Sequence, residues 1–134
     1  MRRSAKARYL LDTCAALLAL SDPDALSEAA RRAILRGPNL LSVVTYWEVI
    51  LKSMKGKLDV GDPRVWWSDA LEQLAATPLL LRPEHIAAIP GLPPLHKDPF
   101  DRALLAQAVS ESLTLVSQDA EVVRYARKDL RVIL

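Results

Sequence analysis

The chain has 134 residues and a mass of 14.8 kDa, a length at which one domain can bury its own hydrophobic core without disulfides or a structural metal. Hydrophobic residues make up 51% of the sequence and aromatic residues only 5%, which excludes a disordered chain and favours an aliphatic core of helices on a sheet. The formal net charge is only +2, so the overall charge by itself selects no class of partner.

The predicted elements of the first half begin with a strand. Residues 7–12 form a short apolar run that ends on an aspartate, and a helix follows over 13–21. A second helix is predicted over 22–37, because it opens with Asp-Pro and closes at a glycine. A strand over 39–44 then leads into a helix over 45–58.

The second half continues this alternation. Its predicted elements are a helix over 61–78, a strand over 79–82, helices over 83–91 and within 96–108, a strand over 112–119, a helix over 120–126 and a strand over 130–134. Strands that alternate with helices predict an α/β fold, with a central, mostly parallel sheet of four to five strands and helices on both faces. We expect a single domain over 1–134, with residues 1–7 as a basic leader.

Four acidic residues fall near the ends of the predicted strands. Asp12 and Asp119 directly follow two strands, and Glu48 and Asp101 lie in the first turns of two helices. Ligands of an open parallel sheet gather outside the carboxyl ends of its strands, so the four side chains can converge on one rim.

Each acid also has a structural interpretation. Thr45 to Glu48 spells the T-x-x-E pattern of a capping box, and Asp98 before Pro99 suits the N-cap of a helix whose first turn contains Asp101. Taken singly, Glu48 and Asp98 favour the structural role. Taken together, four acids at corresponding strand ends favour a site over four independent caps.

Crowded carboxylates repel one another unless a cation of high charge density lies between them. Oxygen ligands favour Mg²⁺ or Mn²⁺, and such ions support phosphodiester hydrolysis. With these four acids neutralised, 18 basic residues stand against 12 acidic ones, a surplus that favours RNA or DNA as the substrate.

Four segments carry a resemblance to a known family. "YLLDTCAALLAL", "SVVTYWEVILKSMKGKL", "HKDPFDRALLAQA" and "TLVSQDAEVVRY" resemble, in order and spacing, the signature segments of PIN-domain nucleases, and most of all the VapC toxins of toxin–antitoxin pairs. The resemblance covers nearly the whole chain and implies the PIN-like three-layer fold. It maps the acids of the family onto Asp12, Glu48, Asp101 and Asp119.

The resemblance also implies supporting residues. Ser117 occupies the hydroxyl position that often accompanies the last acid, Thr13 follows the first acid, and Asp98 is the extra acid of the D-P-F-D-R subgroup. Either Asp98 or Asp101 can be the direct metal ligand; we favour Asp101, with Asp98 as a cap behind it.

The function that the resemblance implies is a Mg²⁺- or Mn²⁺-dependent endoribonuclease that a VapB-type antitoxin covers. The expected assembly is a homodimer, alone or in a larger complex with the antitoxin. The alternative is a PIN module without cleavage that binds RNA or an antitoxin. A glycine loop for nucleotides is excluded, because the four glycines are isolated.

Other residues give weaker predictions. Lys52, Lys55 and Arg102 are candidates for RNA contacts, although charged residues on a helix are most often a solvated face. Trp47, Trp66 and Trp67 are candidates for an antitoxin-binding surface; packing at the edge of the core is the alternative.

The single cysteine, Cys14, cannot form an internal disulfide, and with two histidines it makes too sparse a set for zinc. A cytoplasmic protein is therefore expected. Asp12 interrupts the first apolar stretch, so neither a signal peptide nor a membrane span is predicted.

Overall fold

The computed structural model describes residues 7–94, 98–125 and 130–134. The strands are β1 (Tyr9–Leu11), β2 (Asn39–Ser42), β3 (Ala76–Leu79), β4 (Thr114–Val116) and β5 (Arg131–Ile133). The helices are α1 (Thr13–Ser21), α2 (Glu28–Arg36), α3 (Val43–Met54), α4 (Pro63–Gln73), α5 (Pro83–Ala88) and α6 (Pro99–Ser110). Shorter 3₁₀ turns are η1 (Pro23–Ala25), η2 (Ile89–Gly91) and η3 (Ala120–Tyr125).

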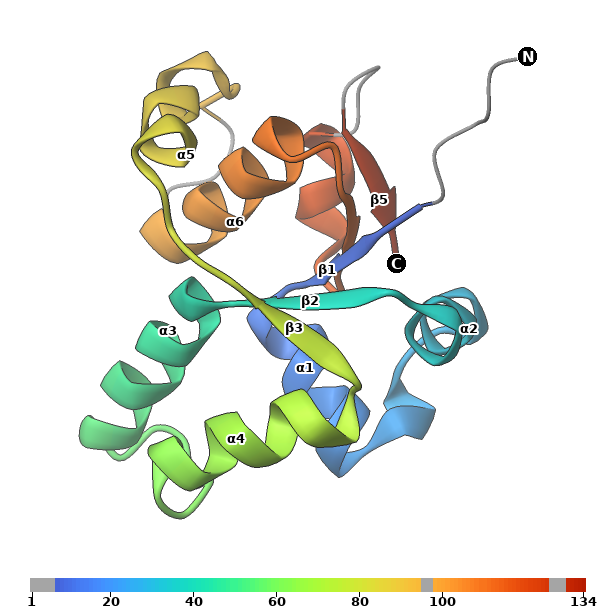
Figure 1. The fold of residues 1–134 in the computed structure, drawn as a ribbon, viewed down its shortest axis with the longest axis vertical. Coiled ribbons are helices and arrows are strands. Elements are labelled where there is room, and N and C mark those ends of the chain that lie inside the picture. Colours follow the sequence, from blue (N-terminus) through green and yellow to red (C-terminus); the bar gives the residue numbers. More distant parts are fainter. Residues whose placement is uncertain (1–6, 95–97, 126–129) are drawn as a thin grey trace.

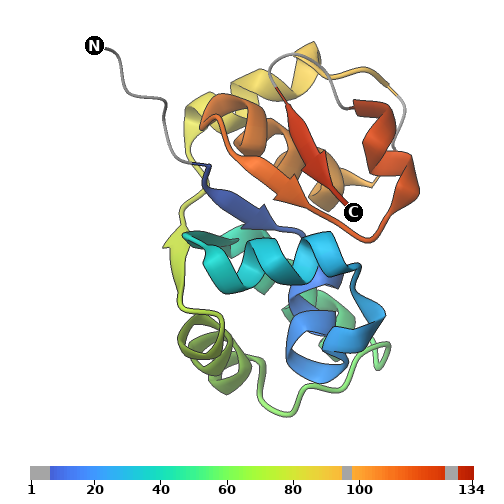
Figure 2. The same ribbon diagram turned by 90° about the vertical axis from the view of Figure 1, so that its right-hand side faces the viewer.

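The five strands form one sheet in the order β3-β2-β1-β4-β5, and every neighbouring pair is parallel (Figure 1). Figure 2 shows the sheet as a middle layer, with α5, α6 and η3 on one side and α1, α2 and α4 on the other. The predicted α/β fold, with a parallel sheet of four to five strands between helices, is confirmed.

Two apolar cores lie on the two faces of the sheet. Along β1, Leu10 joins the core with Leu105 of α6, whereas Tyr9 and Leu11 join the core with Ala33 of α2. Successive side chains of a strand point to opposite faces, so a central strand that is covered on both faces is apolar throughout. This explains why all three residues of β1 are buried. Asp12, the next residue, lies at the carboxyl end of this strand.

The helix predicted over 22–37 is divided in two. The 3₁₀ turn η1 is followed by extended backbone at Leu26, and α2 begins only after Ser27. The Ser27 hydroxyl accepts a hydrogen bond from the Ala30 backbone N–H at 3.1 Å, so a new N-cap separates the two segments. The predicted helix at 120–126 is likewise a 3₁₀ turn in its described part.

The third strand lies three residues earlier than predicted. Helix α4 ends at Gln73, because Ala75 adopts a positive φ of 48° and the chain then turns into β3. The sequence analysis extended this helix to Pro78, but Pro78 belongs to the strand. A proline is tolerated there because β3 lies at the edge of the sheet.

The helix predicted from Thr45 begins two residues earlier. Its N-cap is Ser42, whose hydroxyl accepts from the Val44 N–H at 3.0 Å. The predicted capping box of Thr45 and Glu48 is therefore wrong, and Glu48 lies in the second turn rather than the first. Because Glu48 is not used as a cap, its carboxylate is available to other partners.

Residues 1–6 of the predicted basic leader lie outside the described residues. Within the described ranges, no helix has both the length and the apolar character that a membrane crossing requires.

Candidate active site

The order of the strands reverses at β1. Strands β2 and β3 extend the sheet on one side of β1, and β4 and β5 extend it on the other. In open parallel sheets, ligands bind outside the carboxyl ends of the strands at such a switch point. Asp12 follows β1 directly, and its backbone N–H donates to the Val116 carbonyl at the end of β4, with N and O 2.9 Å apart. Asp12 thus lies at the switch point.

Asp12 is a buried carboxylate with only 6% of its surface exposed. Its Oδ1 accepts from the Ala15 N–H at 2.8 Å, which caps α1, and its side chain is hydrogen-bonded to Ser117. Burial raises the pKa of Asp12 above its ordinary value of 3.8; the bonds from Ser117 and Ala15 oppose this rise, and the charges of Glu48 and Asp119 add to it. The charges of two other acids therefore reach this carboxyl group.

Ser117 connects Asp12 to the loop after β4. Its side chain is fully buried, and its Oγ accepts from the Asp119 N–H at 3.0 Å. Asp119 in turn accepts from the Glu121 N–H through Oδ1 at 2.9 Å, at the start of η3. The hydroxyl group of Ser117 thus holds the side chain of the first of the four predicted acids and the backbone of the last one.

Glu48 is buried on α3, with 4% of its surface exposed. Its Oε2 lies 2.8 Å from the Lys52 Nζ, one helical turn further along. Its Oε1 is buried and has no hydrogen-bond partner among the described residues. Buried carboxylate oxygens are normally satisfied, so this oxygen is one to which a ligand can be added.

Asp98 and Asp101 have different roles at the start of α6. Asp98 Oδ1 accepts from the N–H groups of Phe100 and Asp101, at 2.8 Å and 3.3 Å, and is the N-cap of the helix. The hydrogen bond with Glu48 raises the pKa of Lys52, and the charges of Asp98 and Asp101 add to that rise. Both aspartates are therefore near the ammonium group that Glu48 binds.

A buried pair of hydroxyls joins the two helices that flank the rim. Thr13 Oγ1 of α1 and Thr45 Oγ1 of α3 are 3.0 Å apart. Thr13 follows Asp12 in the chain, and Thr45 lies one turn before Glu48. This contact sets the distance between the helices that carry these two acids.

The charges of three of the predicted acids act on the thiol of Cys14. Burial raises the pKa of Cys14, and the charges of Asp12, Asp119 and Asp101 raise it further. These three acids therefore lie near Cys14. As the side chains are placed, however, no group of three or more His, Cys, Asp or Glu residues within the described ranges is arranged to hold a metal ion.

The residues proposed for RNA contacts do not all share one surface. Lys52 binds Glu48, and Lys55 is exposed at the end of α3. Arg102 instead donates to the carbonyl groups of Pro93 and Ile89, at 3.0 Å and 3.2 Å, and holds the loop before α6. The Glu48–Lys52 contact was missed in the sequence, although the i,i+4 spacing of Glu before Lys is its usual signal.

The three tryptophans do not share one surface. Trp67 stacks on Tyr46, with ring centroids 4.8 Å apart, and joins α4 to α3. Trp66 lines a cleft of about 630 Å³ between α1 and α4. Trp47 is on the other side of α3, 54% exposed, and meets Phe100 edge to face at 5.0 Å. The predicted antitoxin surface is thus divided between two sides of α3.

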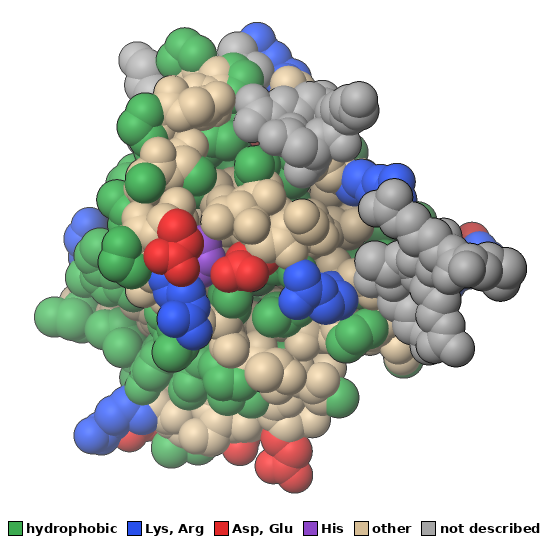
Figure 3. Space-filling view, turned by 45° about the horizontal axis from the view of Figure 1, so that its top comes forward, with side chains coloured by type: hydrophobic (Ala, Val, Ile, Leu, Met, Phe, Trp, Pro, Cys, Tyr) green, Lys and Arg blue, Asp and Glu red, His purple; other side chains and the backbone are tan. Residues whose placement is uncertain are grey.

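A buried polar network that the sequence did not reveal supports the start of α3. Fully buried His85 accepts from the Arg82 N–H through Nδ1 at 3.0 Å, so its Nε2 carries the proton toward Glu111 at 2.9 Å. Gln107 lies beside His85 and accepts from the Ser42 hydroxyl at 2.6 Å. Figure 3 shows a histidine side chain (purple) almost covered by acidic and basic side chains. No motif marks these residues, because they come from separate segments.

Residues 9–128 match the family model of the PIN domain. Among solved structures, the fold is similar to VapBC2 from Rickettsia felis bound to a promoter DNA fragment (TM-score 0.67, 16% identity, 93% of this chain and 96% of that one). It is also similar to DNA-bound VapBC from Salmonella typhimurium (0.66, 16%, 96% and 98%) and to FitAcB from Neisseria gonorrhoeae (0.61, 22%, 94% and 96%). No curated protein sequence matches the chain.

Proposed function

Because the chain belongs to the PIN domain family, we propose that it is a VapC-type toxin, an endoribonuclease that hydrolyses RNA phosphodiester bonds with Mg²⁺ or Mn²⁺. PIN domains are generally metal-dependent nucleases. The observation that carries the proposal is the position of Asp12 at the switch point of the sheet, where burial raises the pKa of Asp12 and the charges of Glu48 and Asp119 add to that rise.

The chemistry of the rim fits a hard divalent cation. Its donors are carboxylate oxygens, which suit Mg²⁺ and Mn²⁺ better than soft metals. Glu48 Oε1 is buried without a hydrogen-bond partner among the described residues, and the acids repel one another around Asp12. Since no three acids are arranged to hold an ion as they stand within the described ranges, we propose that rotation of their side chains brings them together.

We assign the metal to Asp12, Asp101, Asp119 and Glu48. Asp98 already accepts two backbone hydrogen bonds, so Asp101 is the better direct ligand. The ion, when bound, would activate a water and offset negative charge on the phosphate oxygens. Ser117 would orient Asp12 and the loop of Asp119, and the Thr13–Thr45 contact would hold α1 and α3 at a fixed separation.

We propose that a VapB-type antitoxin occupies the cleft beside Trp66. This cleft of about 630 Å³ has apolar walls, such as Leu17, and an acidic rim of Asp59, Asp62 and Asp69. Such a surface fits a segment with apolar and basic side chains. The solved structures of VapBC complexes support a partner of this kind, and an RNA substrate would place the protein in the cytoplasm.

We also propose a homodimer, alone or in a larger complex with the antitoxin. Leu80 and Ile86 are apolar side chains about half exposed near α5, and exposed apolar groups that are close in the chain often mark a contact between subunits. The molecular mass in solution tests this directly.

Cleavage of defined RNAs tests the main proposal. The purified chain is incubated with single-stranded and structured RNAs, with Mg²⁺ or Mn²⁺ and with a chelator, beside an Asp12→Asn control. We expect metal-dependent products from the wild type alone. Equal activity of the Asp12→Asn protein, or activity that a chelator leaves intact, would reject the proposed mechanism.

The second candidate is a PIN module that binds RNA or an antitoxin without cleavage. The absence of a preformed metal-binding group within the described ranges favours it. Tight antitoxin binding, without RNA cleavage and without stabilisation by Mg²⁺ or Mn²⁺, would establish this alternative.

A further inference from the structure

A second cleft opens beside the carboxylate rim, between the end of α3 and the start of α6. Its volume is about 210 Å³. Lys52, Lys55 and Lys57 line it from the α3 side, and Asp98 and Phe100 line it from α6. Three cationic side chains thus share a small concave space with an aromatic ring.

The charge in this cleft that lacks a partner is positive. Lys52 is bound to Glu48, and Asp98 accepts from two backbone N–H groups, so these three charged groups have partners within the protein. Lys55 and Lys57 are exposed, and within the described ranges neither makes an ion pair. An anion that enters the cleft would therefore meet two ammonium groups without displacing an existing contact.

The cleft shares Glu48 with the proposed metal site. Glu48 lines the cleft and also acts on Asp12 at the switch point. Lys55 lies two helical turns beyond Glu48, which is about 10 Å along the helix axis. An anionic polymer that is bound at the rim would therefore extend past these lysines.

An aromatic surface adjoins the lysines. Phe100 forms part of the cleft, and Trp47 packs edge to face against its ring, with centroids 5.0 Å apart. Slightly more than half of the Trp47 surface is exposed, although its edge is fixed by Phe100. An exposed indole beside a cationic groove is the combination that binds single-stranded nucleic acid, because bases stack on the ring while the backbone meets the cations.

We propose that this cleft binds the RNA strand next to the bond that is cut, with Lys55 and Lys57 on phosphate groups and Trp47 stacked on a base. The inference rests on the proposed function and assigns the position of the substrate strand. It removes Trp47 from the candidate antitoxin surface. The simpler explanation is that Lys55 and Lys57 only stabilise the carboxyl end of α3, where Lys55 is the C-cap.

Binding without cleavage tests the proposal. Fluorescence anisotropy with a short labelled single-stranded RNA of mixed sequence is measured in EDTA over a range of salt concentrations, with single-stranded DNA of the same sequence as a second probe. Lys55→Gln/Lys57→Gln should weaken RNA binding roughly tenfold and make the salt slope shallower by about 1.4, the value for two phosphates of a single strand. Trp47→Ala should weaken binding roughly tenfold with an unchanged salt slope.

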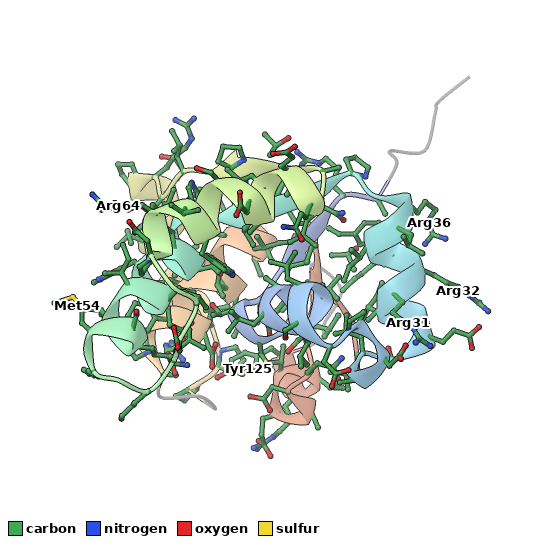
Figure 4. The ribbon with its side chains drawn as sticks, turned by 90° about the horizontal axis from the view of Figure 1, so that it is seen from below. Arg31, Arg32, Arg36, Met54, Arg64 and Tyr125 are labelled. Atoms are coloured by element: carbon green, nitrogen blue, oxygen red, sulfur yellow. The ribbon has the colours of Figure 1, made fainter. Side chains whose placement is uncertain are left out.

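The matched control is Arg31→Gln/Arg32→Gln on α2, which removes the same charge. Figure 4 shows these arginines on the opposite side of the molecule from Met54 at the end of α3. The control should bind RNA as the wild type does. The proposal is overturned if the wild type does not bind RNA in EDTA, or if the lysine variant binds RNA with wild-type affinity and salt slope. It is also overturned if the arginine control loses as much RNA affinity as the lysine variant.

The binding and cleavage assays distinguish an incorrect assignment of this cleft as an RNA subsite from an incorrect assignment of the protein as a nuclease. RNA binding that depends on Lys55 and Lys57, without cleavage in Mg²⁺ or Mn²⁺, supports the subsite and rejects the nuclease. Metal-dependent cleavage with unchanged affinity and rate in the lysine and tryptophan variants rejects the subsite alone. Equal affinity for RNA and DNA supports binding through backbone phosphates and bases, because neither contact uses the 2′-hydroxyl.

Discussion

Lys52 binds Glu48 across one turn of α3, with Nζ and Oε2 2.8 Å apart, although the lysine is about half exposed and the glutamate is almost completely buried. An exposed pair at this spacing contributes only a few tenths of a kcal/mol, roughly 0.2–0.5. Here one member is a carboxylate away from water, and such a group is costly when it loses its cation. In the metal-free protein, the Lys52 ammonium group therefore balances the negative charge of Glu48.

Lys52→Met should destabilise the metal-free protein by roughly 1–3 kcal/mol, because Glu48 then loses its cation. Mg²⁺ or Mn²⁺ should recover most of this loss by taking the place of the ammonium group. Urea unfolding with and without Mn²⁺ measures both effects. Lys55→Met, at the C-cap of the same helix and without an ion pair in the described part of the chain, is the control and should lower stability by less than Lys52→Met does.

Asp12→Asn should stabilise the metal-free protein at neutral pH. Because the pKa of Asp12 is raised in the folded state, the folded carboxyl binds its proton more tightly than the unfolded one. Ionised Asp12 thus lowers stability above the raised pKa, and this loss disappears as the pH falls toward 3.8. Asparagine keeps the N-cap of α1. Thermal melts in EDTA should show a gain of roughly 2–5 °C at pH 7 that vanishes near pH 4; a gain independent of pH would contradict this assignment.

Mg²⁺ and Mn²⁺ should raise the melting temperature of the wild-type protein, because an ion that binds only the folded state stabilises it. At a concentration of a hundred times Kd, the expected stabilisation is about 2.7 kcal/mol. Differential scanning fluorimetry with metal and then EDTA measures this shift. The Asp12→Asn and Asp119→Asn proteins should show no shift, and a wild type that is indifferent to millimolar metal would argue against the site.

The variants Asp98→Asn and Asp101→Asn should show which of the two aspartates only caps α6 and which one binds the metal directly. Asparagine is as good an N-cap as aspartate, so Asp98→Asn should keep α6 and most of the metal-induced shift. Its cleavage rate should fall by no more than roughly 10–100-fold, the usual range for a residue behind a ligand. Asp101→Asn should lose both the shift and the activity. The reverse result would make Asp98 the direct ligand.

Val65→Lys should weaken antitoxin binding without unfolding the protein. Val65 is exposed and lines the cleft beside Trp66, so a charged side chain there would obstruct an apolar partner segment. Isothermal titration with the antitoxin should show at least a tenfold rise in Kd, equal to about 1.4 kcal/mol. Leu35→Lys, on the exposed side of α2, is the control. Equal affinities for both variants and the wild type would exclude this cleft.

Much of the fold could be predicted because its central strands are covered on both faces. The apolar runs that became β1 and β4 are short and end at polar residues, so the position of Asp12 directly after β1 followed from the sequence. Asp119, predicted at the end of its strand, lies instead in the loop after Val116, the last residue of β4. The closeness of the two aspartates also required the order of the strands, in which β1 and β4 are neighbours. Strand order is a property of the packed sheet, and local sequence patterns do not determine it.

The first residue of a helix was harder to predict where two nearby residues could both serve as its N-cap. Ser42 and Thr45 are both good helix caps, and the valines between them favour a strand. The structure selects Ser42, whose hydroxyl also donates to buried Gln107. That long-range contact has no counterpart in local propensity, which is why the start of α3 and the turn that holds Glu48 were misplaced.

The direct pairing of β1 with β4 brings together two segments that are far apart in the sequence, since Tyr9 pairs with Thr114. A nascent chain must therefore be extended through β4 before the rim can form, and a fragment that ends before α6 contains only Asp12 and Glu48 of the four acids. The metal site proposed for these acids would then be completed only after Asp119 has been synthesised.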